Sequence, residues 1–389
     1  MTRVLLVDTN FSARPILVAL QEAGFEVFTV GGRPDDALAD SYPNYLPLDY
    51  SDIDALETLI RDRDIEFLVP GCNDRSYAVC CEVSMRCGIS GFEKPGVLKN
   101  LHDKSRFREL CRRLSLPAPK AYGSIEEALS ANGSLIVKPV DSFSGRGVTV
   151  IGERTELSIA NAITKAQQNS HDGCAVIEDY VEGQLFSYSA FFSQSQVRAA
   201  FNVAEFCSVN PYTVDTSYVV RENKFEKQLE QDLEKLADQL QLNSGLLHIQ
   251  YISNGEQYWL IEPTRRCPGD LYSELIERAT SYNYAKAYMS SFVGRRPEVR
   301  QTINVANTVR HTVSTLTNGK FESVDFIENR DLAAWYPLAE SGKLMNSITG
   351  NRLGLAFYET ASEAERDRLV NTIIEGNVAK ISLTEVADE

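Results

Sequence analysis

The chain has 389 residues, enough for two or three packed domains. Its net charge of −15 disfavours non-specific binding to nucleic acid or to an anionic membrane, because both need a positive protein surface. No stretch approaches the roughly 20 apolar residues that span a bilayer, and the apolar run near the N-terminus is too short for a signal-peptide core. We therefore expect a cytoplasmic protein with neither nucleic-acid nor membrane partners.

The eight cysteines are scattered, with no C-x-x-C pair and no neighbouring histidines. This spacing disfavours a structural zinc site and favours reduced, mostly buried thiols. Cys267 lies inside a motif described below, where we expect a small buried residue and not a nucleophile.

The first 95 residues alternate strand and helix signals. The expected strands are 4–7, 26–30 and 66–70, and the expected helices are 15–23, 53–61 and 76–86. Such alternation predicts a parallel sheet covered by helices, as in a Rossmann-like domain. The segment after the first strand, 8–13, has no glycine, which excludes the usual dinucleotide fingerprint.

The rest of the chain predicts a mixture of hairpins and helices, so the fold class is α/β, with α+β character in part. Helices are expected at 103–116, 157–168, 224–242 and 362–375, strands at 134–138, 147–151, 174–177, 307–316 and 352–357, and hairpins at 184–193 with 197–203 and 245–252 with 257–261. The stretch 204–224 has no clear period and is interpreted as a long loop.

Three local patterns carry chemistry. In the first, Lys138 ends an apolar strand and a Ser/Gly loop follows at 142–148, which suits phosphate because small residues free backbone N–H groups to cradle oxygens. The alternative is a hairpin with a flexible turn and a surface lysine. In the second, a strand runs into a turn at 178–183, where Glu178 could accept a hydrogen bond from adenine; an acidic strand end is the alternative.

The third pattern is a hairpin that can bring oxygen-bearing side chains together. Gln250 and Glu262 can lie side by side on adjacent strands, and Thr264 shares a face with Glu262 because side chains repeat every two residues. Such a group suits Mg²⁺, and Arg266 on the same face could hold developing negative charge. The alternative is a polar hairpin end. His248 lies two residues before Gln250 and could touch substrate or be structural.

In this order and spacing the patterns resemble the ATP-grasp superfamily, and the resemblance covers nearly the whole chain. It also includes the helix that opens with 103–107 and the proline pair Pro117 and Pro119. The resemblance implies a Rossmann-like domain at 1–100, a linker helix and small lid at 101–183, and a C-terminal ATP-grasp part with the metal hairpin at 184–389.

The resemblance implies ATP and Mg²⁺ as cofactors, with Mn²⁺ as an alternative ion. The implied nucleotide contacts are Lys104, Lys138, Ser142, Ser144, Gly145, Arg146, Gly147, Glu178, Asp179, Tyr180, Val181 and Glu182. The implied metal ligands are Gln250, Glu262 and Thr264, and the implied catalytic residues are Arg266, Lys138 and His248. Three positions depart from the family pattern: Thr264 replaces an asparagine, Gln250 replaces an acid, and Leu185 stands where a ribose-binding acid is expected.

The implied activity is that of a stand-alone carboxylate–amine ligase, for which an amino acid is one candidate substrate. Such an enzyme forms an amide or peptide bond through an acyl phosphate and releases ADP and phosphate. Arg221, Arg265 and Arg310 are candidates for gripping a substrate carboxylate. The alternatives are a phosphoribosyl (purine-type) enzyme, a carboxylase-type enzyme, and a nucleotide-binding regulatory protein without catalysis. The resemblance also allows a homodimer.

Overall fold

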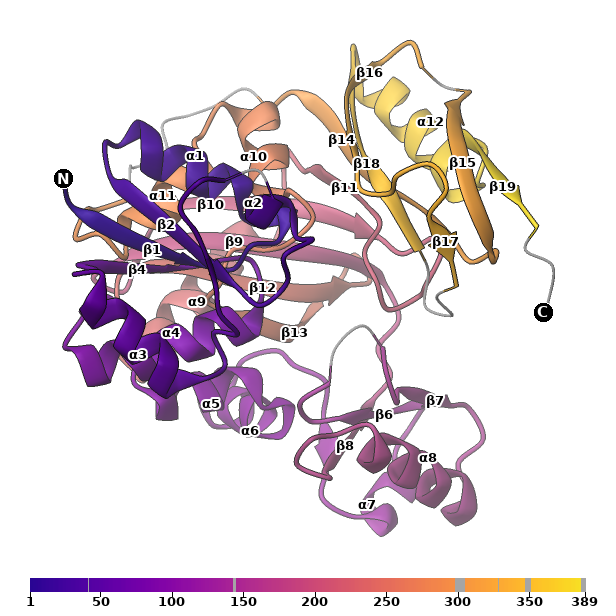
Figure 1. Ribbon diagram of the computed structural model, residues 1–389. Helices are drawn as coiled ribbons and strands as arrows, with labels where there is room; N and C mark the ends of the chain where they lie inside the picture. The colour runs from indigo at the N-terminus through magenta and orange to yellow at the C-terminus, as the bar shows by residue number, and fades with distance from the viewer. Residues whose placement is uncertain (41, 143–144, 298–304, 328, 347–350, 386–389) are drawn as a thin grey trace.

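The computed structural model describes residues 1–40, 42–142, 145–297, 305–327, 329–346 and 351–385. A main body combines an N-terminal parallel sheet with a large central sheet, and a small lid projects from it (Figure 1). A second small sheet with one helix stands at the C-terminal end of the body. Within the described residues no helix is long and apolar enough to cross a membrane.

The N-terminal part is a four-stranded parallel sheet in the order β3-β2-β1-β4, as the Rossmann-like alternation predicted. Strands β1 and β4 are apolar runs that are buried almost throughout, which is typical of strands covered on both faces. The elements are β1 (Arg3–Val7), η1 (Phe11–Ala13), α1 (Arg14–Glu22), β2 (Glu26–Gly31), α2 (Ala37–Asp40), β3 (Tyr45–Pro47), α3 (Ile53–Asp62), β4 (Phe67–Pro70) and α4 (Asp74–Cys87).

Two helices, α5 (Pro95–His102) and α6 (Lys104–Leu114), connect this sheet to the lid. Asp103 separates them: it ends α5, and its side chain caps α6 by accepting from the Arg106 amide. The lid is a four-stranded sheet in the order β5-β8-β6-β7 with two helices. Its elements are β5 (Ala121–Tyr122), α7 (Ile125–Leu129), β6 (Leu135–Pro139), β7 (Thr149–Ile151), α8 (Glu156–Gln168) and β8 (Ala175–Asp179).

The central sheet has eight strands in the order β13-β12-β9-β10-β11-β14-β18-β16, and every neighbouring pair is antiparallel. Its strands are β9 (Gln184–Ser193), β10 (Gln196–Phe206), β11 (Thr216–Val219), β12 (Gly245–Ser253), β13 (Tyr258–Thr264), β14 (Asn307–Thr315), β16 (Leu332–Pro337) and β18 (Asn351–Thr360). Helix α9 (Glu226–Leu240) packs its leucine stripe against β10, as the amphipathic pattern predicted.

The prediction of one long loop at 204–224 is wrong. Strand β10 continues to Phe206, and β11 pairs with both β10 and β14. Strand β11 has only four residues, three of them buried, so its sequence shows no polar–apolar alternation. Thr216, Tyr218 and Val219 favour a strand, and pairing on both edges fixes the segment as one.

The C-terminal part adds a three-stranded sheet in the order β17-β15-β19 and helix α12 (Glu363–Ile374), which Ser362 caps. The strands are β15 (Gly319–Phe326), β17 (Leu344–Met345) and β19 (Ala379–Thr384). Helices α10 (Tyr272–Thr280) and α11 (Tyr284–Ser290) were not predicted from the sequence, and most of their residues are buried.

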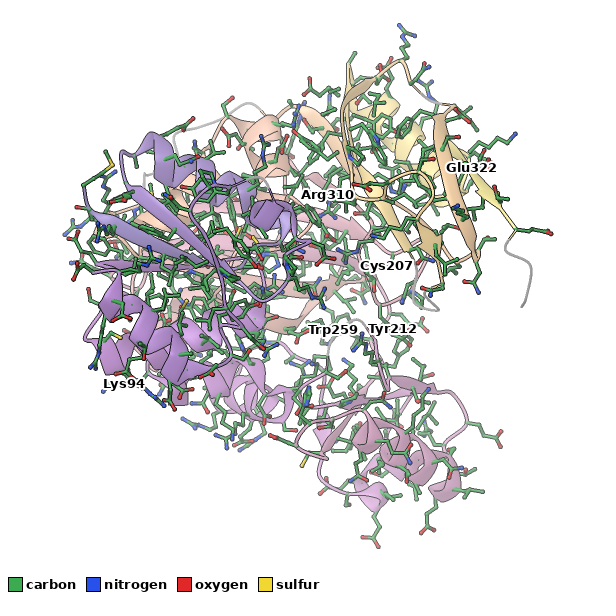
Figure 2. All side chains as sticks on the ribbon, viewed as in Figure 1. Lys94, Cys207, Tyr212, Trp259, Arg310 and Glu322 are labelled. Carbon is green, nitrogen blue, oxygen red and sulfur yellow. The ribbon has the colours of Figure 1, made fainter. Side chains whose placement is uncertain are left out.

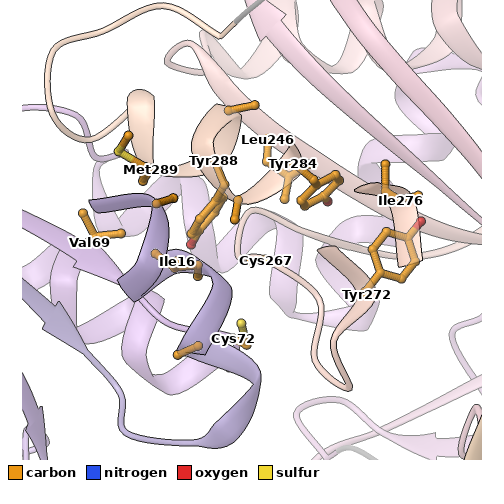
Figure 3. Close-up of a cluster of buried hydrophobic side chains, with 14 of the residues drawn as sticks. Ile16, Val69, Cys72, Leu246, Cys267, Tyr272, Ile276, Tyr284, Tyr288 and Met289 are labelled. Carbon is orange, nitrogen blue, oxygen red and sulfur yellow. The ribbon is translucent and has the colours of Figure 1, made fainter. Parts of the chain in front are cut away.

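The N-terminal and central parts share one core. Ile16 of α1 and Val69 of β4 belong to the same buried cluster as Tyr272, Tyr288 and Met289 from α10 and α11 (Figure 3). Helices α1 and α11 pack directly together. This continuous apolar core fixes the parallel sheet against the central sheet, so residues from both can meet in one site.

The cysteine prediction agrees with the described structure. All eight thiols are free, and five of them are buried. Cys267 is completely buried, as expected for a small packing residue, and Cys72 lies in the same cluster (Figure 3).

Candidate active site

A cavity of about 500 Å³ opens where the linker helices and the lid loop face one side of the central sheet. Six residues that the sequence predicted as metal, nucleotide or catalytic residues line it from outside the lid, together with Ser142 of the lid loop. The six are Lys104, His248, Gln250, Glu262, Thr264 and Arg266. Side chains that are more than 150 residues apart in sequence therefore share one space.

The hairpin β12–β13 has the predicted register. Gln250 pairs with Glu262 and His248 with Thr264, so all four side chains lie on one face of the sheet. Lys104, at the start of α6, places its ammonium 3.2 Å from a Glu262 carboxylate oxygen and donates to the carbonyl of Ser142 at 3.0 Å. Lys104 thus joins the hairpin to the lid loop.

Thr264 and Arg266 both contact Asp74, the first residue of helix α4 in the N-terminal part of the chain. The Thr264 hydroxyl donates to the Asp74 carboxylate at 2.8 Å, and the Arg266 guanidinium contacts both carboxylate oxygens at 3.2 Å. Burial by itself raises the pKa of Asp74, but Arg266 and His102 outweigh it and hold that pKa well below its usual range. Asp74 orients the arginine predicted to stabilise developing charge.

Lys138 belongs to a buried charge cluster with Glu178 and Arg108. The Lys138 ammonium is 2.9 Å from one Glu178 oxygen, and the Arg108 Nε is 2.8 Å from the other. Arg108 also donates to the carbonyl of Ile261 on β13 at 2.9 Å. Burial raises the pKa of Glu178, but the two cations more than offset it, and the net pKa lies below its ordinary value.

In this cluster Glu178 has a structural role that the sequence did not indicate. Both carboxylate oxygens face cations, and the side chain is fully buried. It holds the lid strand β8 to the linker helix and to β13. A contact from Glu178 to adenine stays a prediction.

Part of the turn predicted to bind adenine is hydrogen-bonded within the lid. The Asp179 amide donates to the carbonyl of Lys120 and the Tyr180 amide to that of Ser134, while the Asp179 side chain accepts from the Tyr122 hydroxyl at 2.6 Å. The roles of Tyr180, Val181 and Glu182 in nucleotide binding stay predictions. Gly183 lies so close to the Ser253 carbonyl that a Cβ would be 2.4 Å from it, which explains a glycine there.

The Ser/Gly loop contacts the segment between β10 and β11. Gly145 and Gly147 both have φ +73°, a conformation that favours glycine, and a Cβ on Gly145 would lie 2.4 Å from the Tyr212 ring. The Ser142 hydroxyl donates to the carbonyl of Arg146 at 3.4 Å. Ser144 lies outside the described residues, and the phosphate contacts of this loop stay predictions.

His248 is buried and its Nδ1 lies 2.7 Å from the hydroxyl of Ser189. Its ring packs edge-on against Tyr272, 5.3 Å between centroids. Burial, aided by Arg266, lowers the pKa of His248 to about 3, so the ring is neutral at physiological pH. A direct role in catalysis stays a prediction.

We expect His248 to make the protein lose stability as the pH falls. A histidine whose pKa is depressed on folding contributes stability above its unfolded value of about 6.5, and this contribution disappears as the pH drops. At pH 5 the loss is about 2 kcal/mol for this group. Thermal unfolding of His248→Asn between pH 7 and 5 should therefore be less pH-dependent than that of the wild type. The exposed His171→Asn is the control, and equal slopes for all three proteins would contradict the assignment.

Gln250 is oriented by a buried acid that the sequence analysis missed. Its Nε2 donates to a Glu205 carboxylate oxygen at 2.8 Å, which leaves the amide oxygen as the end able to coordinate a cation. Among the described residues no group of three or more His, Cys, Asp or Glu is arranged to hold a metal. One carboxylate with two neutral oxygen ligands fits Mg²⁺ only when phosphate oxygens complete its shell.

Sequence reasoning missed Asp74, His102, Arg108 and Glu205. None has a local signal, because each reaches the site from a different element of the fold. Of the three arginines proposed for a substrate carboxylate, only Arg310 lines the cavity. Arg265 is buried in an ion pair with Glu93 at 2.6 Å, and Arg221 lies 3.3 Å from Glu363.

Residues 131–273 match the ATP-grasp domain family. This match shows an ATP-grasp domain in that part of the chain, where the ordered motifs predicted one. The L-amino acid ligase from Bacillus licheniformis superposes with a TM-score of 0.77 and 14% identity, covering 99% of each chain. This likeness shows the shared fold.

Two curated proteins are similar in sequence. The formate-dependent phosphoribosylglycinamide formyltransferase of Aliivibrio fischeri is 27% identical over 217 residues, which are 53% of this chain and 53% of that protein. The carbamoyl phosphate synthase large chain of Clostridium acetobutylicum is 22% identical over 270 residues, 64% of this chain and 24% of that protein. The chain thus spans about half or less of the length of these relatives.

Proposed function

We propose that the protein is an ATP-dependent carboxylate–amine ligase that works through an acyl phosphate. The supporting observation is the cavity in which Lys104, Glu262 and Arg266 converge from the linker, the hairpin and its continuation. Cations that can hold phosphate lie beside the side-chain oxygens predicted to coordinate a divalent ion, on one face of the central sheet. This arrangement suits transfer of a phosphoryl group.

In the proposed reaction a substrate carboxylate oxygen attacks the γ-phosphorus of ATP, the bond to the β–γ bridging oxygen breaks, and ADP leaves. An amine then attacks the acyl carbon, and the C–O bond to phosphate breaks. Lys104 and Lys138 would neutralise phosphate charge, and Arg266, held by Asp74, would stabilise the charge that develops. No side chain of the protein needs to form a covalent bond.

The residues that would hold Mg²⁺ are Glu262, Gln250 and Thr264. Bound there, the ion would offset phosphate charge that the lysines leave uncompensated. In the structure the Lys104 ammonium forms an ion pair with the Glu262 carboxylate. Phosphate binding would therefore have to draw the ammonium away from that carboxylate. We expect the ion to bind together with the nucleotide and weakly without it.

A purine-type phosphoribosyl substrate is the second candidate because of the formyltransferase similarity. The end of β1 argues against it. Asp8 occupies the turn there and accepts from the amides of Asn10 and Cys72, and Thr9 donates to Asp36 at 2.8 Å. Two acids at this position disfavour a substrate phosphate. A carboxylase-type reaction has no specific observation in its favour.

The test is ADP release with Mg-ATP over a panel of carboxylic acids crossed with amines. The proposal predicts turnover that requires one acid and one amine together, with one phosphate released per ADP. ATP binding without turnover for any pair would favour a regulatory protein. ADP release with bicarbonate alone would favour a carboxylase.

A further inference from the structure

Arg310 is a buried cation whose hydrogen bonds are incomplete. It lies on β14, is 3% exposed, and lines the cavity at the end away from the lid. One terminal nitrogen donates to the carbonyl of Asp270 at 3.0 Å, while Nε has no hydrogen-bond partner in the described structure. A buried guanidinium with an unused donor is costly unless a ligand takes it. Figure 2 marks Arg310 where the central sheet meets the C-terminal part.

Glu205 is the matching anion in the same cavity. It is 5% exposed and its carboxylate accepts from Gln250. Within the described residues no ion pair joins Glu205 to Arg310.

The sheet register sets the order of these groups. Glu205 on β10 pairs with Ser217 on β11, and Ser217 pairs with Arg310 on β14, so all three side chains lie on one face. Glu205 and Arg310 are two strand spacings apart, about 10 Å between backbones. The residue between them is small, and its buried hydroxyl also has no hydrogen-bond partner. Both long side chains line the same cavity of about 500 Å³, so a small zwitterion bound in it can reach both.

We propose that the amine substrate of this ligase is a free amino acid, whose carboxylate binds Arg310 and whose ammonium binds Glu205. The proposal rests on the proposed ligase function. The strand order orients the substrate: Glu205 lies nearer to Gln250 and Glu262, and Arg310 lies farther from them. The amino group therefore points to the side where the acyl phosphate would form.

The proton balance supports this orientation. An ammonium cannot attack until it loses a proton, and Glu205 accepts that proton. The nitrogen lone pair then forms the C–N bond, the C–O bond to phosphate breaks, and its electron pair leaves with the phosphate, which takes the second proton. The carboxylate on Arg310 takes no part in the chemistry.

The experiment compares amino acids with their amides and decarboxylated amines as acceptors, using the full chain and Mg-ATP. We expect kcat/KM to be about 100-fold higher for the amino acids, the size of a buried charged contact. Arg310→Met should lower kcat/KM for amino acids only, which removes the preference for them. Arg310→Lys should keep part of that preference. Glu205→Gln should lower kcat more than it raises KM. Arg61→Met, which changes an exposed arginine of α3 outside the cavity, is the matched control.

Equal turnover of amino acids and their amides by the wild type would overturn the proposal and leave the ligase function standing. An equal loss on both acceptor classes in Arg310→Met would likewise reduce Arg310 to a structural residue. If no pair of substrates turns over, the ligase function fails and calorimetry with amino acids in the presence of Mg-ADP decides on the subsite. Binding to the wild type and not to Arg310→Met supports it, and no binding to the wild type refutes it.

Discussion

Glu262→Ala is expected to abolish ADP formation, with kcat falling on the order of 1000-fold, comparable to the loss of one preorganised electrostatic contact to a transition state. Glu262 is the only carboxylate among the three predicted metal ligands, and Gln250 and Thr264 are already engaged by Glu205 and Asp74. Without the Glu262 carboxylate, the hairpin would have no negatively charged ligand for a divalent ion. Lys104 would also lose its partner. The measurement is steady-state ADP release at saturating Mg-ATP.

Two variants make this test specific. Glu262→Gln keeps the size of the side chain and should also be inactive, because the carboxylate charge is what matters. Glu256→Ala removes an exposed acid from the turn of the same hairpin and should be close to wild type. Near-normal activity in Glu262→Ala would show that the metal assignment is wrong. Raising Mg²⁺ should partly rescue Glu262→Gln if weakened ion binding is the cause.

Glu178→Ala is expected to destabilise the protein by about 3–5 kcal/mol, the usual cost of removing one partner from a buried ion pair. The change leaves Lys138 and Arg108 facing each other in a buried space. Glu178 has a lowered pKa, so its contribution is present above its unfolded value near pH 4.3 and is lost as the pH falls. The difference between variant and wild type should therefore shrink in acid. Denaturant titration at pH 7 and at pH 4 measures both effects.

The control for this prediction is Glu153→Ala, an exposed acid on the same lid. It should unfold like the wild type. Because Glu178 ties the lid to α6 and β13, its removal should also make the lid more susceptible to proteolysis than the rest of the chain. A stable Glu178→Ala protein with unchanged protease resistance would show that the cluster does not hold the lid.

Much of the site could be predicted because its parts are local. The hairpin needs only a turn sequence and two-residue alternation to bring Gln250 beside Glu262, and the structure has that register. Lys104 follows a helix cap, and Lys138 ends an apolar strand. The Rossmann-like alternation and the α9 stripe are likewise short-range patterns. Local sequence therefore determined the motifs of the ATP-grasp domain and the longer helices and strands.

Only the tertiary structure decided how the charges are paired. Asp74, Arg108, Glu205 and Arg310 come from four different elements, so no sequence spacing relates them to the hairpin. Pairing between strands fixed β11, whose four residues show no polar–apolar alternation. Packing between distant segments gave Thr264 its hydrogen bond to Asp74 and Glu178 its ion pairs with two cations. Burial and partners set the charge state of a side chain, and both arise when distant segments pack together.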